Sequence, residues 1–110
     1  MGGVMLYTIN ELRQKIKPIA VKYNLPVVYV FGSYARNEAT DDSDLDILID
    51  KNGSKVKSLF DMSRLHNELC EIFKKEVDLI TTYALSQDNE NGKEPLFRER
   101  VMQERIAIYD

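Results

Sequence analysis

The stretch VVYVFGSYARNEATDDSDLDILI, residues 27–49, decides the fold because it places one polar segment between two strongly apolar runs. Residues 27–31 are β-branched and aromatic, and residues 45–49 are apolar apart from Asp46, so both runs predict buried strands. A carboxylate inside a buried strand is costly unless it pairs with a cation, takes up a proton or binds a metal ion. We therefore expect the chemistry of this chain around Asp46.

Amphipathic helices are predicted on either side of these strands. Residues 8–23 carry apolar side chains at helical spacing, with Thr8 as N-cap, Glu11 completing a capping box and Pro18 as a potential kink. Residues 56–75 repeat apolar side chains every three and four positions, which predicts a long helix with one apolar face.

The remaining segments predict short elements. A third strand at 77–80 again embeds an acid, Asp78, among apolar neighbours. The other expected elements are a short helix at 33–37, an exposed loop at 86–94, a helix at 95–104 and an edge strand at 106–109. Helices that alternate with three or four short strands predict one α/β domain with a single sheet, spanning residues 1–110.

Length and composition limit the class of protein. The chain has 110 residues, enough for one domain with a real core, and its formal net charge of −3 argues against a general nucleic-acid binder, although a local basic patch stays open. The single cysteine, Cys70, excludes an internal disulfide and is expected to be a small core residue in a reducing cytosol. Without a signal peptide or membrane-spanning run, we expect a cytoplasmic protein.

Asp44 and Asp46 are two residues apart, so in a strand their carboxylates project from the same face. Like charges this close repel unless a cation neutralises them, and hard oxygen ligands select Mg²⁺ or Mn²⁺ over softer metals. If the strand at 77–80 lies beside the one at 45–49, Asp78 joins the same cluster. Three acids could then hold two ions, the arrangement that clamps the attacking and leaving oxygens of a phosphoryl displacement.

Gly32 and Ser33 follow the first strand directly and predict a phosphate-binding turn. Gly32 permits close backbone approach, Ser33 supplies a hydroxyl, and the first N–H groups of a short helix favour an anion. Arg36, one turn further on, could add a positive charge to the phosphates. Ordinary alternatives stay open, since Gly-Ser is a common turn, residues 41–43 suit a solvated loop and Asp44 alone suits a turn.

Other functional motifs are excluded or left open. An EF-hand loop fails because Ile47 and Gly53 stand where calcium binding needs glycine and glutamate, and a P-loop fails because Gln87 stands where its first glycine should be. The single histidine, His66, is expected on the solvated side of its helix. Tyr34 is left open between stacking on a base and a structural role.

Gly-Ser, ten intervening residues and Asp-x-Asp, with a third acid on a later strand, resemble the DNA polymerase β-like nucleotidyltransferase superfamily. The stretch 27–49 looks like its smallest members, the minimal nucleotidyltransferases. The resemblance implies a mixed sheet of three to four strands flanked by helices. By position it implies that Gly32 and Ser33 bind the triphosphate, and that the catalytic, metal-ligating acids are Asp44, Asp46 and Asp78.

The resemblance also implies a reaction and a partner. ATP would be the substrate, two Mg²⁺ ions the cofactors, and an acceptor hydroxyl would attack the α-phosphorus in line, helped by positioning and charge neutralisation. Minimal members that resemble this chain act as antitoxins that adenylylate a tyrosine of a HEPN-domain toxin, without direct nucleic-acid binding. Two alternatives stay open: AMP transfer to a small molecule such as an aminoglycoside, and a non-catalytic antitoxin that acts by contact.

Overall fold

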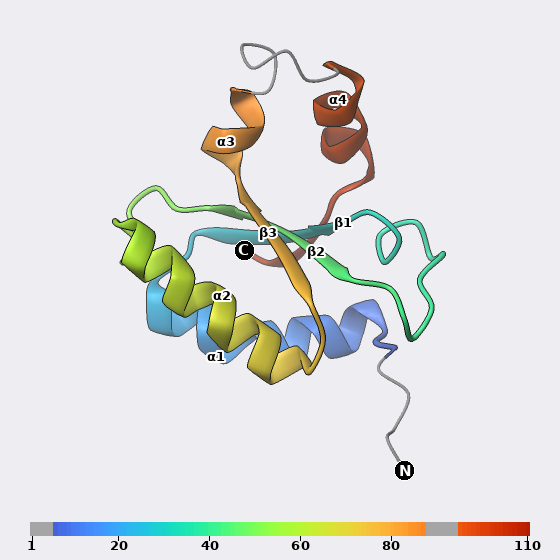
Figure 1. Cartoon of the computed structure of the whole chain (residues 1–110), viewed down its shortest axis with the longest axis horizontal. Coiled ribbons are helices and arrows are strands. Elements are labelled where there is room, and N and C mark those ends of the chain that lie inside the picture. Colours follow the sequence, from blue (N-terminus) through green and yellow to red (C-terminus); the bar gives the residue numbers. More distant parts are fainter. Residues whose placement is uncertain (1–5, 88–94) are drawn as a thin grey trace.

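The computed structural model describes residues 6–87 and 95–110 as a mixed sheet with helices on both faces (Figure 1). Within these residues the strands are β1 (Val27–Phe31), β2 (Leu45–Asp50), β3 (Val77–Thr81) and β4 (Ile106–Tyr109). The helices are α1 (Ile9–Tyr23), α2 (Leu59–Phe73), α3 (Thr82–Ser86) and α4 (Pro95–Glu104). α1 and α2 cover one face of the sheet, and α3 and α4 stand on the other (Figure 1). The predicted class, an α/β fold with a small mixed sheet flanked by helices, is confirmed.

The strand order β3-β2-β1-β4 brings the predicted site residues to one end of the sheet. β1 runs antiparallel to both β2 and β4, whereas β2 and β3 are parallel and are connected through α2. A parallel pair needs such a crossover connection. The register pairs Phe31 with Asp46, and Asp46 with Asp78. The end of β1 therefore lies beside the beginnings of β2 and β3.

The two faces of β2 pack against different cores. Its residues 45, 47 and 49 are buried against α1 and α2 in the larger core. Leu48 instead packs with Phe31 beneath α3 and α4. Because alternate residues of a strand point to the same face, Asp46 lies on the face of Leu48. The acid is therefore kept out of the larger core.

α1 begins and ends as its sequence predicts. The Thr8 hydroxyl accepts the Glu11 N–H, and the Glu11 carboxylate accepts the Thr8 N–H, which completes the capping box. Pro18 lies inside the helix without ending it. Asn24 then takes the left-handed conformation at the C-cap, with φ 55°.

α2 is shorter than the predicted helix at 56–75. It begins at Leu59 because Ser58 and Asp61 form a capping box that the sequence analysis did not recognise. It ends at Phe73, before Lys74 with φ 55°. Both ends were therefore predicted two or three residues too far out, which is the usual uncertainty of helix boundaries.

Two predictions between the strands and helices were wrong. Residues 33–37 form successive turns and no helix, because the carbonyl of Gly32 accepts the N–H of Arg36 but the helical pattern is not continued. In addition, α3 was not predicted, although the hydroxyl of its N-cap residue, Thr81, accepts the N–H of Ala84. Ser86, expected in a loop, is therefore the last residue of α3, and residues 88–94 of that loop lie outside the described residues. α4 and β4 have the predicted bounds.

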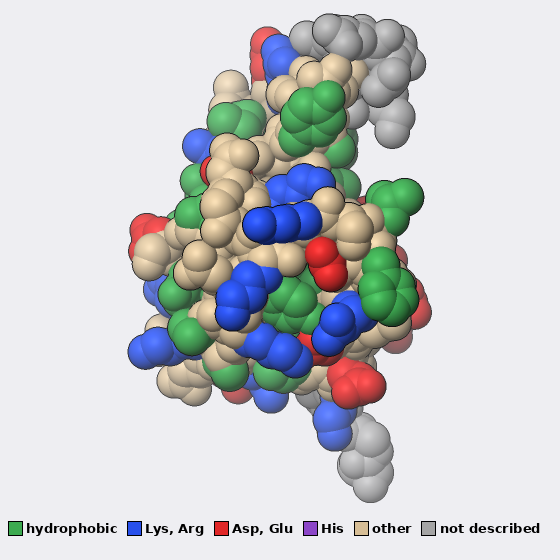
Figure 2. Space-filling model, turned by 90° about the vertical axis from the view of Figure 1, so that its left-hand side faces the viewer, with side chains coloured by type: hydrophobic (Ala, Val, Ile, Leu, Met, Phe, Trp, Pro, Cys, Tyr) green, Lys and Arg blue, Asp and Glu red, His purple; other side chains and the backbone are tan. Residues whose placement is uncertain are grey.

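Charge is distributed unevenly over the surface. Figure 2 shows Lys and Arg side chains gathered on the face at the left of Figure 1, so the local basic patch left open by the sequence is present. The segment between β1 and β2, which contains Asp41 and Asp42, lies at the opposite end of the sheet (Figure 1). Among the helices of residues 6–87 and 95–110, none is both long and apolar enough to span a membrane.

Candidate active site

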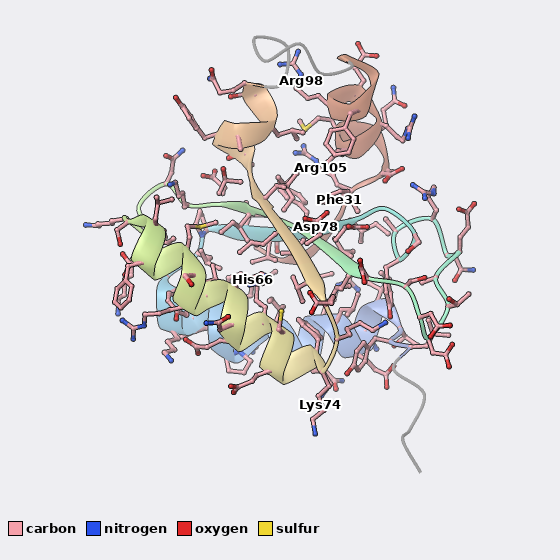
Figure 3. All side chains as sticks on the ribbon, viewed as in Figure 1. Phe31, His66, Lys74, Asp78, Arg98 and Arg105 are labelled. Carbon is pink, nitrogen blue, oxygen red and sulfur yellow. The ribbon has the colours of Figure 1, made fainter. Side chains whose placement is uncertain are left out.

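Asp46 and Asp78 are cross-strand neighbours on the parallel strands β2 and β3. Adjacent strands lie about 4.8 Å apart, so both carboxylates leave the sheet within a few ångströms of each other on the same face. Asp44 is exposed and comes one residue before β2. Figure 3 shows Asp78 on β3 near Phe31, the last residue of β1. The fold therefore places Asp78 beside Asp46, with Asp44 just before the strand that carries Asp46.

The surroundings of Asp46 disfavour its charge. Burial, followed by the charges of Asp78 and Asp44, raises the pKa of Asp46 to about 6, and Arg36 partly opposes this rise. Glu104 is a further negative group that raises the pKa. Such a cluster of like charges is stabilised when a cation binds among its members. The electrostatics therefore favour a cation at this end of the sheet.

The carboxylates have the oxygen donors that Mg²⁺ prefers. Within residues 6–87 and 95–110, however, no group of three or more His, Cys, Asp or Glu side chains converges closely enough to hold a metal ion. Metal ligation by Asp44, Asp46 and Asp78 therefore stays a prediction based on donor chemistry and charge.

The glycine turn after β1 is packed directly against Asp46. Gly32 is buried and has a φ of 72°, in the left-handed region that strongly favours glycine. A Cβ atom at this position would overlap the Asp46 carboxylate, with its Cγ only 3.1 Å away. The neighbouring Ser33 is half-buried, and its hydroxyl has no hydrogen-bond partner within the described part of the chain. The turn that packs against Asp46 therefore carries, on its next residue, a hydroxyl that forms no hydrogen bond among the described residues.

Arg36 is held by two carboxylates. Its Nε donates to Glu38 Oε1 at 3.0 Å, and its Nη1 donates to Glu104 Oε1 and Oε2 at 3.0 and 3.1 Å. Hydrogen bonds to Glu38 and then to Glu104 raise the pKa of Arg36 further above its ordinary value. Arg36 was expected near the phosphates, but Glu104 gave no signal in the sequence, because only the pairing of β4 with β1 brings the end of α4 to this turn.

Lys75 is a second site residue that the sequence analysis missed. Its Nζ donates to the Tyr34 hydroxyl at 2.8 Å and to the carbonyl of Ser43 at 2.6 Å. Tyr34 directly follows the Gly-Ser pair, and Ser43 directly precedes Asp44. Lys75 therefore ties together the two ends of the segment between β1 and β2. Buried to 5% exposure, Tyr34 has the structural role that the sequence left open.

His66 differs from its expected solvated position. The side chain is half-buried on α2, and its Nε2 lies 2.8 Å from the carbonyl oxygen of Val77 at the start of β3. Figure 3 shows His66 on α2, away from Asp78. The histidine therefore connects a helix to the sheet and lies outside the cluster of acids. Cys70 is half-buried and packs against the larger core, as expected.

Comparison with known proteins agrees with this geometry. A family model described as polymerase beta, nucleotidyltransferase matches residues 14–110, which is most of the chain. This chain belongs to the polymerase β nucleotidyltransferase family. The predicted family and the predicted class of enzyme are therefore confirmed.

Relatives of this nucleotidyltransferase include small archaeal proteins of similar length. It is 40% identical over 100 residues to a Methanocaldococcus jannaschii protein named "Putative protein adenylyltransferase MJ0435", covering 91% of this chain and 97% of that protein. It is 35% identical over 84 residues to the protein adenylyltransferase MntA of Thermococcus cleftensis, covering 73% and 83% of the two chains.

Solved structures share the fold of this nucleotidyltransferase. One described as a "putative minimal nucleotidyltransferase" has a TM-score of 0.61 and 31% identity, with 91% of this chain and 95% of that chain covered. A toxin-antitoxin structure with AMP-PNP has a TM-score of 0.64 and 19% identity, with 88% and 72% covered, and it shows the fold alone. The polymerase β-like fold is therefore confirmed.

Proposed function

We propose that this nucleotidyltransferase transfers AMP from ATP to a tyrosine hydroxyl of a HEPN-domain toxin and so acts as an antitoxin. The observation that carries the proposal is the register of Asp46 with Asp78, with the Gly32 turn packed against Asp46 and Ser33 following in that turn. The names of the archaeal relatives, which are protein adenylyltransferases, support a protein acceptor. The toxin-antitoxin structures of the same fold support a toxin partner.

The proposed reaction is an in-line displacement at the α-phosphorus of ATP. A bond forms between the acceptor hydroxyl oxygen and the α-phosphorus, and the bond from that phosphorus to the bridging oxygen of the β-phosphate breaks, so pyrophosphate leaves. The proton of the hydroxyl passes to a carboxylate base. Asp78 is the best candidate for this base because its carboxylate is exposed beside Asp46 and is therefore open to an acceptor.

The other residues of the site bind and orient the nucleotide. Ser33 and the Gly32 turn would hold the triphosphate, and Arg36 would contribute positive charge. Mg²⁺ ions held by Asp44, Asp46 and Asp78 would, when bound, neutralise the triphosphate and the developing charge. The chain itself mainly provides positioning, which accounts for a large part of catalysis in such displacements.

The proposal is tested with the purified chain, the protein encoded next to it, Mg²⁺ and ATP labelled on the α-phosphate. We expect the label on a tyrosine of the partner and a mass increase of one AMP. A double variant, Asp44→Asn with Asp46→Asn, should transfer no label, whereas Asp42→Asn in the exposed loop should behave as wild type. Label on an aminoglycoside but not on the partner would overturn the protein acceptor. If the wild type neutralises the partner without transferring AMP, and the double variant neutralises it equally well, the protein is an antitoxin that acts by contact and not by catalysis.

A further inference from the structure

Glu104 connects the end of α4 to the glycine turn. Its Oε2 accepts the N–H of Gly32 at 2.6 Å, and both of its oxygens accept Arg36 Nη1. The topology explains this contact, since β4 pairs with β1 so that Ile106 lies opposite Val30. Two residues further along each antiparallel strand are Glu104 and Gly32. The Glu104 side chain thus continues the strand pairing where the backbone ladder has ended.

The Glu104 carboxylate is well shielded from water, since its side chain is only 13% exposed. A charge in such a place needs partners, and the Gly32 N–H and the Arg36 guanidinium provide them through charge-assisted hydrogen bonds. A negative group beside a site for a polyphosphate opposes the binding of that anion directly. Any benefit of Glu104 to the site must therefore come through the groups it holds.

Arg36 is the group through which Glu104 can act. Glu38 accepts the hydrogen bond of Arg36 Nε, and Glu104 accepts those of Nη1. Within residues 6–87 and 95–110, Nη2 donates to no acceptor. The planar guanidinium cannot rotate freely when two of its three nitrogens are fixed. Its remaining N–H groups are therefore available in a set direction, at 41% side-chain exposure.

We propose that Glu104 is a positioning residue, which orients Arg36 so that Nη2, which donates to no acceptor among the described residues, binds the polyphosphate of the nucleotide. This inference rests on the proposed function, because it assumes that the nucleotide binds beside Gly32 and Ser33. Glu104 also accepts the N–H of Gly32, so one carboxylate holds both the Arg36 guanidinium and the backbone of the glycine turn in place. It touches no reacting atom.

The test is a double-mutant cycle on nucleotide affinity. We measure binding of Mg²⁺·ATP and of inorganic pyrophosphate to wild type, Glu104→Gln, Arg36→Gln and the double variant. Glu104→Gln should weaken ATP binding about tenfold and raise KM more than it lowers kcat, as expected when an oriented charged hydrogen bond is lost. In the Arg36→Gln background the same change should alter affinity by less than about twofold, because the two residues act as one unit. Glu99→Gln, an exposed position on α4, is the matched control and should change nothing.

Several outcomes overturn the inference. If the losses of ATP affinity caused by Glu104→Gln and Arg36→Gln add in the double variant, Glu104 has a merely structural role. If Glu104→Gln binds ATP as tightly as wild type or more tightly, Glu104 has no positioning role. If Glu104→Gln does not fold, Glu38→Gln serves as the second variant, because it removes the other ion pair of Arg36. Its loss of ATP affinity must then also be non-additive with that of Arg36→Gln. Wild type that binds ATP but transfers no AMP would refute the proposed function alone. Wild type that binds neither ATP nor pyrophosphate would refute both.

Discussion

Gly32 packs against Asp46 so closely that no Cβ atom fits between them. The strand register produces this contact, because Phe31 lies opposite Asp46 and Gly32 is the next residue. The left-handed φ of 72° then turns the chain back over the carboxylate. The two halves of the sequence motif, which are separated by ten residues between Ser33 and Asp44, are therefore in direct contact in the folded protein.

Gly32→Ala should destabilise the fold and abolish transfer. The left-handed conformation alone costs an alanine about 1–2 kcal/mol, and the overlap with Asp46 adds to this cost. Gly53 is the matched control, since it also has a φ of 72° but, apart from its chain neighbours, no atom of the described residues lies within 4 Å of its Cβ position. Gly53→Ala should lose only about 1–2 kcal/mol and keep its activity. Denaturant unfolding and AMP-transfer assays test both variants. If Gly32→Ala and Gly53→Ala lose equal amounts of stability and activity, the overlap with Asp46 has no effect.

Asp46→Asn should be more stable than wild type at neutral pH in metal-free buffer. The pKa of Asp46 is raised to about 6 in the fold from 3.8, so the folded protein binds the proton more tightly than the unfolded chain. Wild-type stability should therefore fall as the pH rises from about 4 to about 6 and level off above that range. Since Asp46 is only partly buried, we expect a gain of about 1–2 kcal/mol for Asp46→Asn at pH 7, and little gain at pH 4.

This prediction is checked by denaturant unfolding of both proteins at several pH values in the presence of a chelator. When Mg²⁺ is restored, wild type should transfer AMP and Asp46→Asn should not, because the variant lacks the carboxylate proposed to hold the metal. A gain in stability with a loss of activity is the result expected when like charges are concentrated for function. A wild type whose stability rises between pH 4 and pH 6 relative to Asp46→Asn would contradict the predicted sign.

Asp78→Asn should lower transfer while sparing much of the nucleotide affinity. If Asp78 receives the acceptor proton, its loss should reduce kcat by about 10²–10⁴-fold. Glu76→Gln is the control, because Glu76 is exposed and lies just before β3. Its backbone carbonyl accepts the N–H of Leu45, and this hydrogen bond does not involve the side chain that is changed. Single-turnover transfer and equilibrium ATP binding separate the two effects. Transfer at the wild-type rate by Asp78→Asn would remove this residue from the catalytic set.

Lys75→Met should loosen the segment that carries the site. The substitution keeps most of the aliphatic stem but removes both hydrogen bonds, to Tyr34 and to the Ser43 carbonyl, which are worth about 1–3 kcal/mol together. We expect a lower denaturation midpoint and a higher KM for ATP. Lys74→Met, at the exposed neighbouring position, should leave both quantities unchanged. Equal behaviour of the two variants would show that Lys75 does not hold the segment.

Local features of the site were predictable from the sequence, and long-range contacts were not. Asp46 and Asp78 stood out because each is an acid among strand-forming neighbours, and Gly32 stood out because it directly follows a strand. Glu104 and Lys75 gave no such signal, since a charged residue near the end of a helix is ordinary. The solvated position expected for His66 was wrong because the nearness of β3 to α2 is a tertiary property.

The sequence by itself determined the four strands and the three longer helices of the described residues, and the class of enzyme. Apolar runs rich in strand-forming residues placed β1 and β2 closely, and Pro95, which suits a first helical position, placed the start of α4, because these are local properties of the chain. The tertiary structure decided which charged groups share the site. Strand order and register place Asp78 beside Asp46 and Glu104 beside Gly32, and such pairings between distant residues depend on how whole elements pack, which no local pattern contains.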